Sequence, residues 1–213
     1  DSSFRLDVPA LTEELSHNVD LLILCNPNNP TSSVIPRNQM RDILDYCKKK
    51  SITVLVDETY VEFAPDVQAV TAIPLTEYYN NIIILRGISK FFAAPGLRLG
   101  YAICGNKDLL KEINQKKNPW TINSLAAIAG EIMFSDEEYI RKTRQLIAGE
   151  RERVCQAIRS MDAYQVYESN CNFVLVKIKK EGLTADQIFD TAIRQGLMIR
   201  DCSTFPFLND KYF

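Results

Sequence analysis

The chain has 213 residues, of which 46% are hydrophobic, and a formal net charge of −2 at pH 7. This size and composition suit one large or two modest globular domains, and the weak negative charge argues against nucleic acid as a partner. No apolar stretch approaches the roughly 18 residues of a membrane-spanning helix, so we expect no membrane association. Six scattered cysteines without a C-x-x-C pair are typical of a reduced, cytoplasmic protein. The single histidine, His17, is too little for a multi-histidine metal site, and we expect it on the surface.

The first half of the chain alternates short apolar runs with helical segments. The predicted strands are 20–25, 52–56, 82–85 and 99–104, and the predicted helices are 11–15, 36–50 and, after a loop, a short one within 63–79. The second helix has apolar residues at helical spacing on one face, namely Met40, Ile43, Leu44 and Cys47. Because the strands are apolar throughout, they predict an α/β fold with a mostly parallel sheet that helices cover on both faces.

The second half of the chain has a different pattern. Helices are predicted at 107–117, 123–134 and 136–161. The remaining residues predict a small α+β unit with strands at 165–168, 173–178 and 198–200 and a helix at 185–195. We therefore divide the chain into a large domain (1–117), linking helices (118–161) and a small C-terminal domain (162–213).

One lysine is placed in an unusual setting. Lys90 follows the predicted strand 82–85 and precedes Phe91, Phe92 and Ala93. Poor solvation lowers the pKa of an ammonium group and makes the amine nucleophilic, which is the property of a lysine that forms a Schiff base. On this stretch alone, a lysine that extends its charge into solvent from a strand end is an equally good interpretation.

Further polar residues follow the other predicted strands. Asn29 follows the first strand, Asp57 and Tyr60 follow the second, and Arg98 lies eight residues after Lys90. Ligands of open α/β sheets bind beyond the carboxyl ends of the strands, so these side chains are expected to share one cleft. Taken singly, each has a structural interpretation: a turn former, a helix cap, a core residue and a salt-bridge partner, respectively.

Three motifs in this order carry a resemblance to a known family. Residues 26–31 (NPNNPT), residues 57–60 (DETY), and Ser89-Lys90 with Arg98-Leu99-Gly100 resemble the fold-type I pyridoxal-phosphate enzymes of aminotransferase class I/II. The resemblance covers nearly the whole chain. It implies pyridoxal 5′-phosphate as cofactor, a homodimer, and a partial large domain followed by a partial small α+β domain.

The resemblance also implies a role for each residue. Lys90 would hold the cofactor as a Schiff base and act as the base near the substrate Cα, and Asp57 would pair with the ring nitrogen. The 3′ oxygen of the ring would accept hydrogen bonds from Asn29 and Tyr60. The phosphate would be bound by Ser89 and Arg98, since a guanidinium suits a phosphate dianion. Lys90, Asp57 and Tyr60 are thus the predicted catalytic residues.

Two stretches bear on the reaction. Residues 91–101 and 198–203 look most like threonine-phosphate decarboxylases of cobalamin biosynthesis, whereas histidinol-phosphate aminotransferases share all the cofactor motifs. Decarboxylation of O-phosphothreonine is therefore our first interpretation. Aminotransfer is the second, and it stays open because the sequence does not determine which bond of the substrate Cα is broken. A non-catalytic α/β binding module is a third. A dinucleotide-binding fold is disfavoured, because no G-x-G-x-x-G follows a strand.

The sequence departs from the family pattern at three places. Gly87 stands where the family often has a serine or threonine, so one phosphate-binding hydroxyl is missing. The family's earlier glycine-and-serine loop has no counterpart in these residues, and neither has its later carboxylate-binding arginine. We therefore expect a fragment that binds cofactor weakly and turns over poorly. Further candidates for lining the cleft are Asn123, Asn172 and Arg200.

Overall fold

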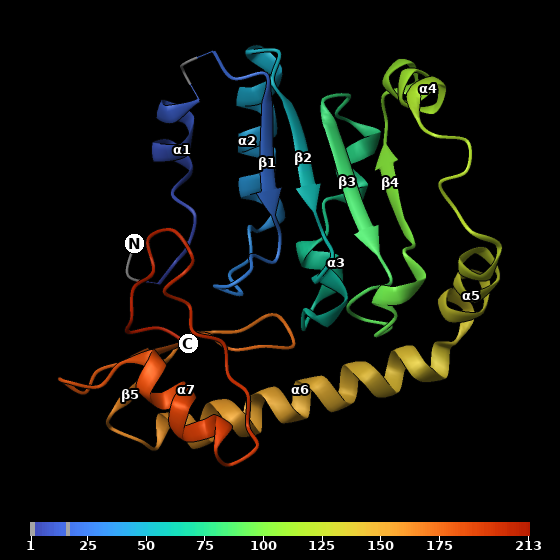
Figure 1. Cartoon of the computed structure of the whole chain (residues 1–213). Coiled ribbons are helices and arrows are strands. Elements are labelled where there is room, and N and C mark those ends of the chain that lie inside the picture. The colour runs from blue at the N-terminus through green and yellow to red at the C-terminus, as the bar shows by residue number, and fades with distance from the viewer. Residues whose placement is uncertain (1–2, 16–17) are drawn as a thin grey trace.

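A four-stranded sheet forms the centre of the larger part of the chain (Figure 1). The computed structural model describes residues 3–15 and 18–213, so His17 lies outside the described residues. The strands are β1 (Leu21–Cys25), β2 (Thr53–Asp57), β3 (Ile82–Gly87) and β4 (Gly100–Cys104), in the order β1-β2-β3-β4. The first three strands are parallel and β4 is antiparallel to β3, which confirms the predicted mostly parallel sheet.

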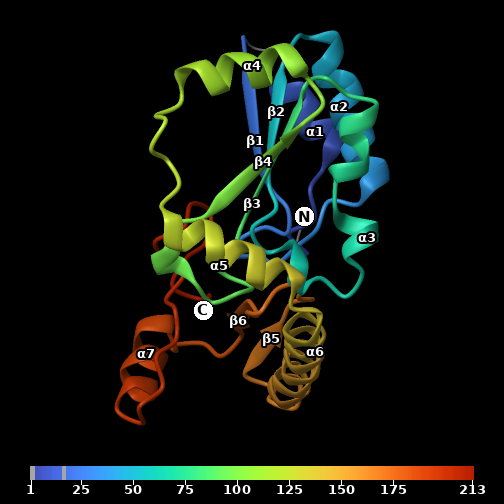
Figure 2. The same cartoon turned by 90° about the vertical axis from the view of Figure 1, so that its right-hand side faces the viewer.

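Helices pack on one face of this sheet (Figure 2). They are α1 (Val8–Glu14), α2 (Arg37–Lys49) and α3 (Val67–Val70), with short 3₁₀ turns at Val61–Phe63 and Ile73–Glu77. The predicted apolar face of α2 is confirmed, because all four of its members are buried: Met40, Ile43, Leu44 and Cys47. They join the buried strand residues Val54, Val56, Ile82 and Ile84 in the main hydrophobic core.

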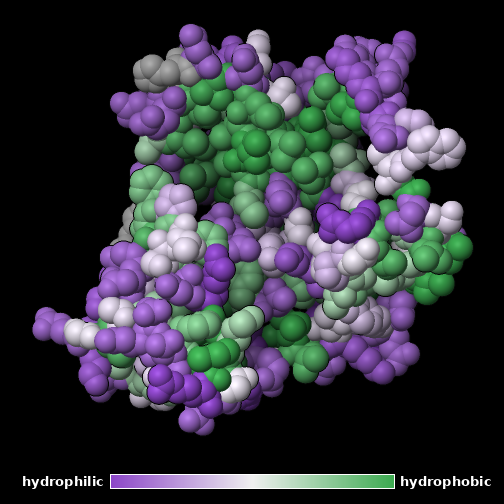
Figure 3. All heavy atoms as spheres, viewed as in Figure 1, coloured by the Kyte–Doolittle hydropathy of each residue, from purple (hydrophilic) through white to green (hydrophobic). Residues whose placement is uncertain are grey.

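The prediction of helices on both faces is wrong for the described residues. On the opposite face of the sheet, Leu21 is 47% and Ile23 is 64% exposed. Figure 3 shows this face as a broad apolar surface. The reason lies partly in the connection between β3 and β4, which contains only the 3₁₀ turn Pro95–Leu97 and returns the chain as an antiparallel neighbour.

A run of helices leads from the sheet to the C-terminal part. It consists of α4 (Lys107–Lys116), α5 (Ser124–Ser135) and the long α6 (Glu137–Arg159), which extends beneath the sheet in Figure 1. Arg151 of α6 donates through Nη1 to the carbonyl oxygens of Phe63 and Cys171, both at 3.0 Å. This arginine therefore ties the sheet-bearing part to the C-terminal part, although the domain boundaries at 117 and 161 stay predictions.

The C-terminal part contains a two-stranded antiparallel sheet and one helix. These are β5 (Tyr164–Val166), β6 (Val176–Ile178) and α7 (Ala185–Ile193). The strand predicted at 198–200 is not formed. The free edge of β6 instead bonds to the last residues of the chain, with Val176 N donating to Phe213 O at 2.8 Å and Ile178 N to Lys211 O at 2.7 Å. No helix in the described part of the chain is long and apolar enough to cross a membrane.

Candidate functional site

The carboxyl ends of the three parallel strands meet at one edge of the sheet. Cys25, Asp57 and Leu85 are aligned across β1, β2 and β3 by the strand register. The segments that follow the strands therefore start side by side, as Figure 1 shows. This is the edge at which open α/β sheets bind ligands.

The segment after β1 is held by a buried asparagine. The Asn26 side chain is fully buried, accepts from Ile35 N at 2.8 Å, and donates to Ile35 O at 3.2 Å and to Val70 O at 3.3 Å. Its backbone N–H donates to Asp57 O at 2.9 Å, which extends the β1–β2 pairing by one bond. Buried polar groups need hydrogen-bond partners, and Asn26 finds them all in the surrounding chain. These bonds fix the start of the loop that leads to Asn29.

Asn29, Tyr60 and Lys90 lie together although they come from three separate segments. Asn29 Nδ2 donates to the Tyr60 hydroxyl at 3.3 Å, and Lys90 Nζ lies 5.7 Å from the centroid of the Tyr60 ring. The Tyr60 ring also contacts Phe173 edge-on at 5.2 Å. The structure thus brings an amide, a phenol and an amine into one cluster.

The expected apolar burial of Lys90 is wrong for this chain, because Lys90 is exposed. Its neighbour Phe91 is 2% exposed and packs against the ring of Phe63 at 5.3 Å between centroids. The apolar neighbour thus packs into an aromatic cluster and does not surround the amine.

Asp57, Ser89 and Arg98 line a pocket of about 480 Å³ beside this cluster, together with Arg86 and others. Asp57 Oδ1 accepts hydrogen bonds from Thr59 N at 2.9 Å and from Thr59 Oγ1 at 2.5 Å. Asn29, Tyr60 and Lys90 are not among the lining residues. The six predicted residues therefore form two groups, joined by the short segments 57–60 and 89–90.

The loop that carries Lys90 and Arg98 contains two strained residues. Ala93 has φ +50° and Arg98 has φ +56°, both in the left-handed region that favours glycine. Arg98 Nη1 donates to Pro95 O at 3.0 Å, which fixes the side chain within its own loop. Such conformations cost about 1–3 kcal/mol each and persist where the surrounding structure imposes them, often at functional sites.

The electrostatic effect of Asp57 extends to the neighbouring strand. Burial raises the pKa of the Cys25 thiol, and the Asp57 carboxylate raises it further against an opposing hydrogen bond from the Asn29 backbone. Cys25 is therefore a neutral thiol at ordinary pH. The site combines one anionic residue, Asp57, with the cations Lys90 and Arg98.

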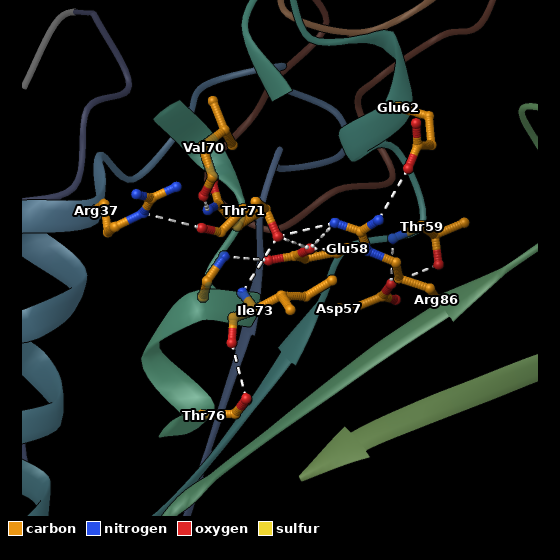
Figure 4. Close-up of polar contacts among 12 residues, drawn as sticks. Arg37, Asp57, Glu58, Thr59, Glu62, Val70, Thr71, Ile73, Thr76 and Arg86 are labelled. Atoms are coloured by element: carbon orange, nitrogen blue, oxygen red, sulfur yellow. Dashed lines mark hydrogen bonds and ion pairs between the residues drawn. The ribbon is translucent and has the colours of Figure 1, made fainter. Parts of the chain in front are cut away.

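Three further residues at this edge had no predicted role: Glu58, Thr59 and Arg86. Figure 4 shows Glu58 and Arg86 paired next to Asp57, with Thr59 bonded to the Asp57 carboxylate. A hydroxyl residue two positions after an aspartate is a signal for a local turn bond and could have identified Thr59. The Glu58–Arg86 pair spans 28 residues and had no local signal.

The three other candidates have different environments. Asn123 caps α5 by accepting from Ala126 N at 2.8 Å, and it donates to Leu97 O at 3.2 Å, next to Arg98. Asn172 is exposed. Arg200 lies over the Phe205 ring and lines a separate pocket in the C-terminal part. Asn123 therefore contacts the loop of the candidate site, whereas Arg200 lines a different pocket.

Comparison with known proteins gives the family. The chain matches Aminotransferase class I and II over residues 1–211, and it belongs to this family. It is 31% identical to a threonine-phosphate decarboxylase of Salmonella typhimurium over 96% of this chain and 55% of that protein. The chain thus spans about half the length of this relative.

Two solved structures have the same fold. The histidinol-phosphate aminotransferase of Clostridium acetobutylicum aligns with a TM-score of 0.93 at 30% identity, over 100% of this chain and 63% of that one. The histidinol-phosphate aminotransferase of Sinorhizobium meliloti, solved in complex with pyridoxal-5′-phosphate, aligns with a TM-score of 0.78 at 25% identity, over 92% of this chain and 53% of that one. The predicted fold class is confirmed.

Pyridoxal 5′-phosphate is the cofactor that this family membership supports. The donor set of the chain fits it. The pocket offers a carboxylate for the pyridinium nitrogen and a hydroxyl and a guanidinium for the phosphate. The adjacent cluster offers an amine for the aldehyde carbon and two donors for the ring oxygen.

Proposed function

We propose that the protein is a pyridoxal-phosphate-dependent enzyme that acts on a small amino acid or phosphorylated amine, with decarboxylation of O-phosphothreonine as the reaction. The observation that carries the proposal is that two groups of residues are adjacent at one edge of the sheet. They are the cluster of Asn29, Tyr60 and Lys90 and the pocket lined by Asp57, Ser89 and Arg98. When bound, the cofactor supplies an electron sink for bond cleavage at the substrate Cα.

Each side chain then has one task. Asp57, oriented by Thr59, keeps a proton on the ring nitrogen, because an adjacent carboxylate favours the charged form. Asn29 and Tyr60 donate to the ring oxygen, and Ser89 and Arg98 bind the phosphate. Lys90 would hold the cofactor through its aldehyde carbon until a substrate amine takes its place, and its free amine would then move a proton at the substrate Cα.

Support for decarboxylation comes from the likeness of residues 91–101 and 198–203 to threonine-phosphate decarboxylases, which implies a role in cobalamin biosynthesis. Aminotransfer is the second candidate, and it is favoured by the TM-score of 0.93 to a histidinol-phosphate aminotransferase. A non-catalytic binding module would leave the combination of Lys90, Asp57 and Asn29 without a purpose. We also propose a cytoplasmic location and a homodimer.

Two parallel assays distinguish these functions. The purified full-length protein is incubated with pyridoxal phosphate and O-phosphothreonine, and released carbon dioxide is measured. In the second assay it receives histidinol phosphate and 2-oxoglutarate, and glutamate is measured. Carbon dioxide that disappears in Lys90→Ala supports the decarboxylase, and Lys90-dependent glutamate supports the aminotransferase. Neither product from a protein that binds the cofactor would contradict both.

A further inference from the structure

A largely buried ion pair adjoins the candidate site. The Glu58 side chain is 0% exposed and the Arg86 side chain 11%. Glu58 Oε2 accepts from Arg86 Nη2 at 2.7 Å and from Arg86 Nε at 3.0 Å, as Figure 4 shows. The pair joins the residue after β2 to the penultimate residue of β3.

Both charged groups are fully engaged with further partners. The Thr71 hydroxyl donates to Glu58 Oε2 at 2.8 Å and accepts from Arg86 Nη2 at 2.8 Å. Glu58 Oε1 accepts from Ala72 N at 2.6 Å, and Arg86 Nη1 donates to Glu62 at 2.8 Å. Burial by itself would lower the pKa of the Arg86 guanidinium, but the attraction of Glu58, and then of Glu62, outweighs it and raises this pKa. The arginine is thus held as a cation.

The position of the pair connects it to both groups of site residues. Glu58 directly follows Asp57, and its backbone N–H donates to Leu85 O at 2.9 Å, which extends the β2–β3 pairing beyond Asp57. Arg86 stands three residues before Ser89, and it also lines the pocket that contains Asp57 and Ser89. One ion pair therefore joins the segment with the ring-nitrogen partner to the segment with the phosphate and amine groups.

We propose that the Glu58–Arg86 pair is a positioning unit for the cofactor, an inference that rests on the proposed function. The pair fixes the spacing between Asp57 on one segment and Ser89 and Lys90 on the other. It also occupies the guanidinium of Arg86 at the pocket wall, so Arg98 is the arginine that binds the phosphate. Arg86 lines the pocket, but its guanidinium N–H groups donate to Glu58, Glu62 and Thr71.

Stability alone is a weak reason for this arrangement. The cost of removing two charges from water often equals or exceeds their attraction, and apolar residues of similar volume can replace such pairs without loss of stability. Two nitrogens of Arg86 donate to Glu58, and such a directional contact fixes the relative position of the two segments. This matters where the residues of a site must be held within a fraction of an ångström. The pair lies where such precision is needed.

The test measures the affinity for pyridoxal phosphate in three variants. Circular dichroism establishes that each variant is folded, and each titration is done below the melting temperature of that variant. Glu58→Gln removes the charge, and Thr71→Val removes the shared hydroxyl at nearly constant volume. Glu62→Gln is the matched control, because it removes a carboxylate from the outer side of Arg86 and leaves the Glu58 contact intact. The dissociation constant for pyridoxal phosphate is obtained by titrating the visible absorbance of the Lys90-bound cofactor.

We expect the dissociation constant to rise about tenfold or more in Glu58→Gln and about threefold in Thr71→Val, as for lost hydrogen bonds to a charged group, and to stay within about twofold in Glu62→Gln. The pH at which the visible absorbance changes should also shift in Glu58→Gln and not in Glu62→Gln, because it depends on the placement of Asp57. A merely structural pair would lower the melting temperature without moving that pH.

The results separate this inference from the proposed function. If wild-type protein gives the absorbance and folded Glu58→Gln binds with wild-type affinity and pH dependence, the positioning role is wrong and the function stands. If Glu58→Gln does not fold, Thr71→Val decides in the same way. If wild-type protein shows no absorbance that depends on Lys90, the proposed function is wrong and the positioning role falls with it.

Discussion

Two regions of the molecule differ in how their side chains are packed. They are the carboxyl ends of β2 and β3 and the outer face of α5. At the strand ends, the buried Glu58 and the partly buried Arg86 bond to partners within the described chain. On α5, three apolar residues at helical spacing are exposed, with Leu125 at 73%, Ile128 at 59% and Ile132 at 64%. The strand ends are determined by the chain itself, whereas the outer face of α5 offers apolar area to something else.

This difference bears on the homodimer that we propose. Exposed apolar residues in a contiguous group are typical of a protein–protein interface, since burial there removes them from water. Asn123, which caps the N-terminus of α5, donates from its side chain to Leu97 O beside Arg98. A partner on α5 would thus lie near the candidate site.

The largest effect is expected from a cavity in the core under the strands. Leu44 of α2 is 0% exposed, so Leu44→Ala should lower the free energy of unfolding by about 2–5 kcal/mol. The control Leu125→Ala on α5, where the side chain is exposed, should change the free energy of unfolding of the single chain by less than about 0.5 kcal/mol. Urea unfolding measures both, and equal losses would contradict the contrast between the two regions.

A smaller effect is expected where α6 joins the two parts of the chain. Arg151→Met removes the bonds to Phe63 O and Cys171 O, and should cost about 1.5–3 kcal/mol, as for a hydrogen bond with a charged donor. The control Arg153→Met removes only an exposed pair with Glu150, which solvent screens, and should change stability much less. Urea unfolding compares them, and a larger loss in Arg153→Met would overturn this account of α6.

The pH dependence of stability probes the same junction. Burial raises the pKa of the Cys171 thiol from 9.0 to about 12. Above pH 9 the unfolded thiol releases a proton that the folded one retains, so stability falls as pH rises, on the order of 1 kcal/mol by pH 10. Urea midpoints between pH 8 and 10 should decline less steeply in Cys171→Ala than in the control Cys104→Ala. Identical slopes would argue against this burial effect.

The smallest effect on stability is expected on α5. The double change Leu125→Ser and Ile128→Ser should alter the free energy of unfolding of a single chain by about 0.5 kcal/mol or less, because both residues are exposed. The same change should lower the molar mass measured by light scattering if α5 forms the dimer interface. A dimer of unchanged mass would place the interface elsewhere.

Much of the fold and the site could be predicted from local sequence. Uniformly apolar runs predicted the parallel strands, and the motif order placed Asn29, Asp57, Tyr60 and Lys90 at their carboxyl ends. Properties set by distant packing could not be predicted. Lys90 is exposed because Phe91 packs on a ring 28 positions earlier in the chain, Phe63.

The same limit applies to two elements of the fold. The strand predicted at 198–200 is not formed, and the outer edge of β6 is taken by residues 211–213. The apolar strands predicted coverage on both faces, but the pattern does not say which element supplies it. The Glu58–Arg86 pair likewise depends on the register between β2 and β3, which no single segment reveals.

The most direct test of the proposed function is to detect a covalent bond between Lys90 and the cofactor. The protein is incubated with pyridoxal phosphate, reduced with borohydride, digested and mapped by mass spectrometry, with Lys90→Ala and Lys107→Ala treated alike. We expect the cofactor mass on the peptide that contains Lys90, no cofactor mass in Lys90→Ala, and unchanged labelling in Lys107→Ala. Labelling spread over other lysines, or equal labelling in Lys90→Ala, would contradict it.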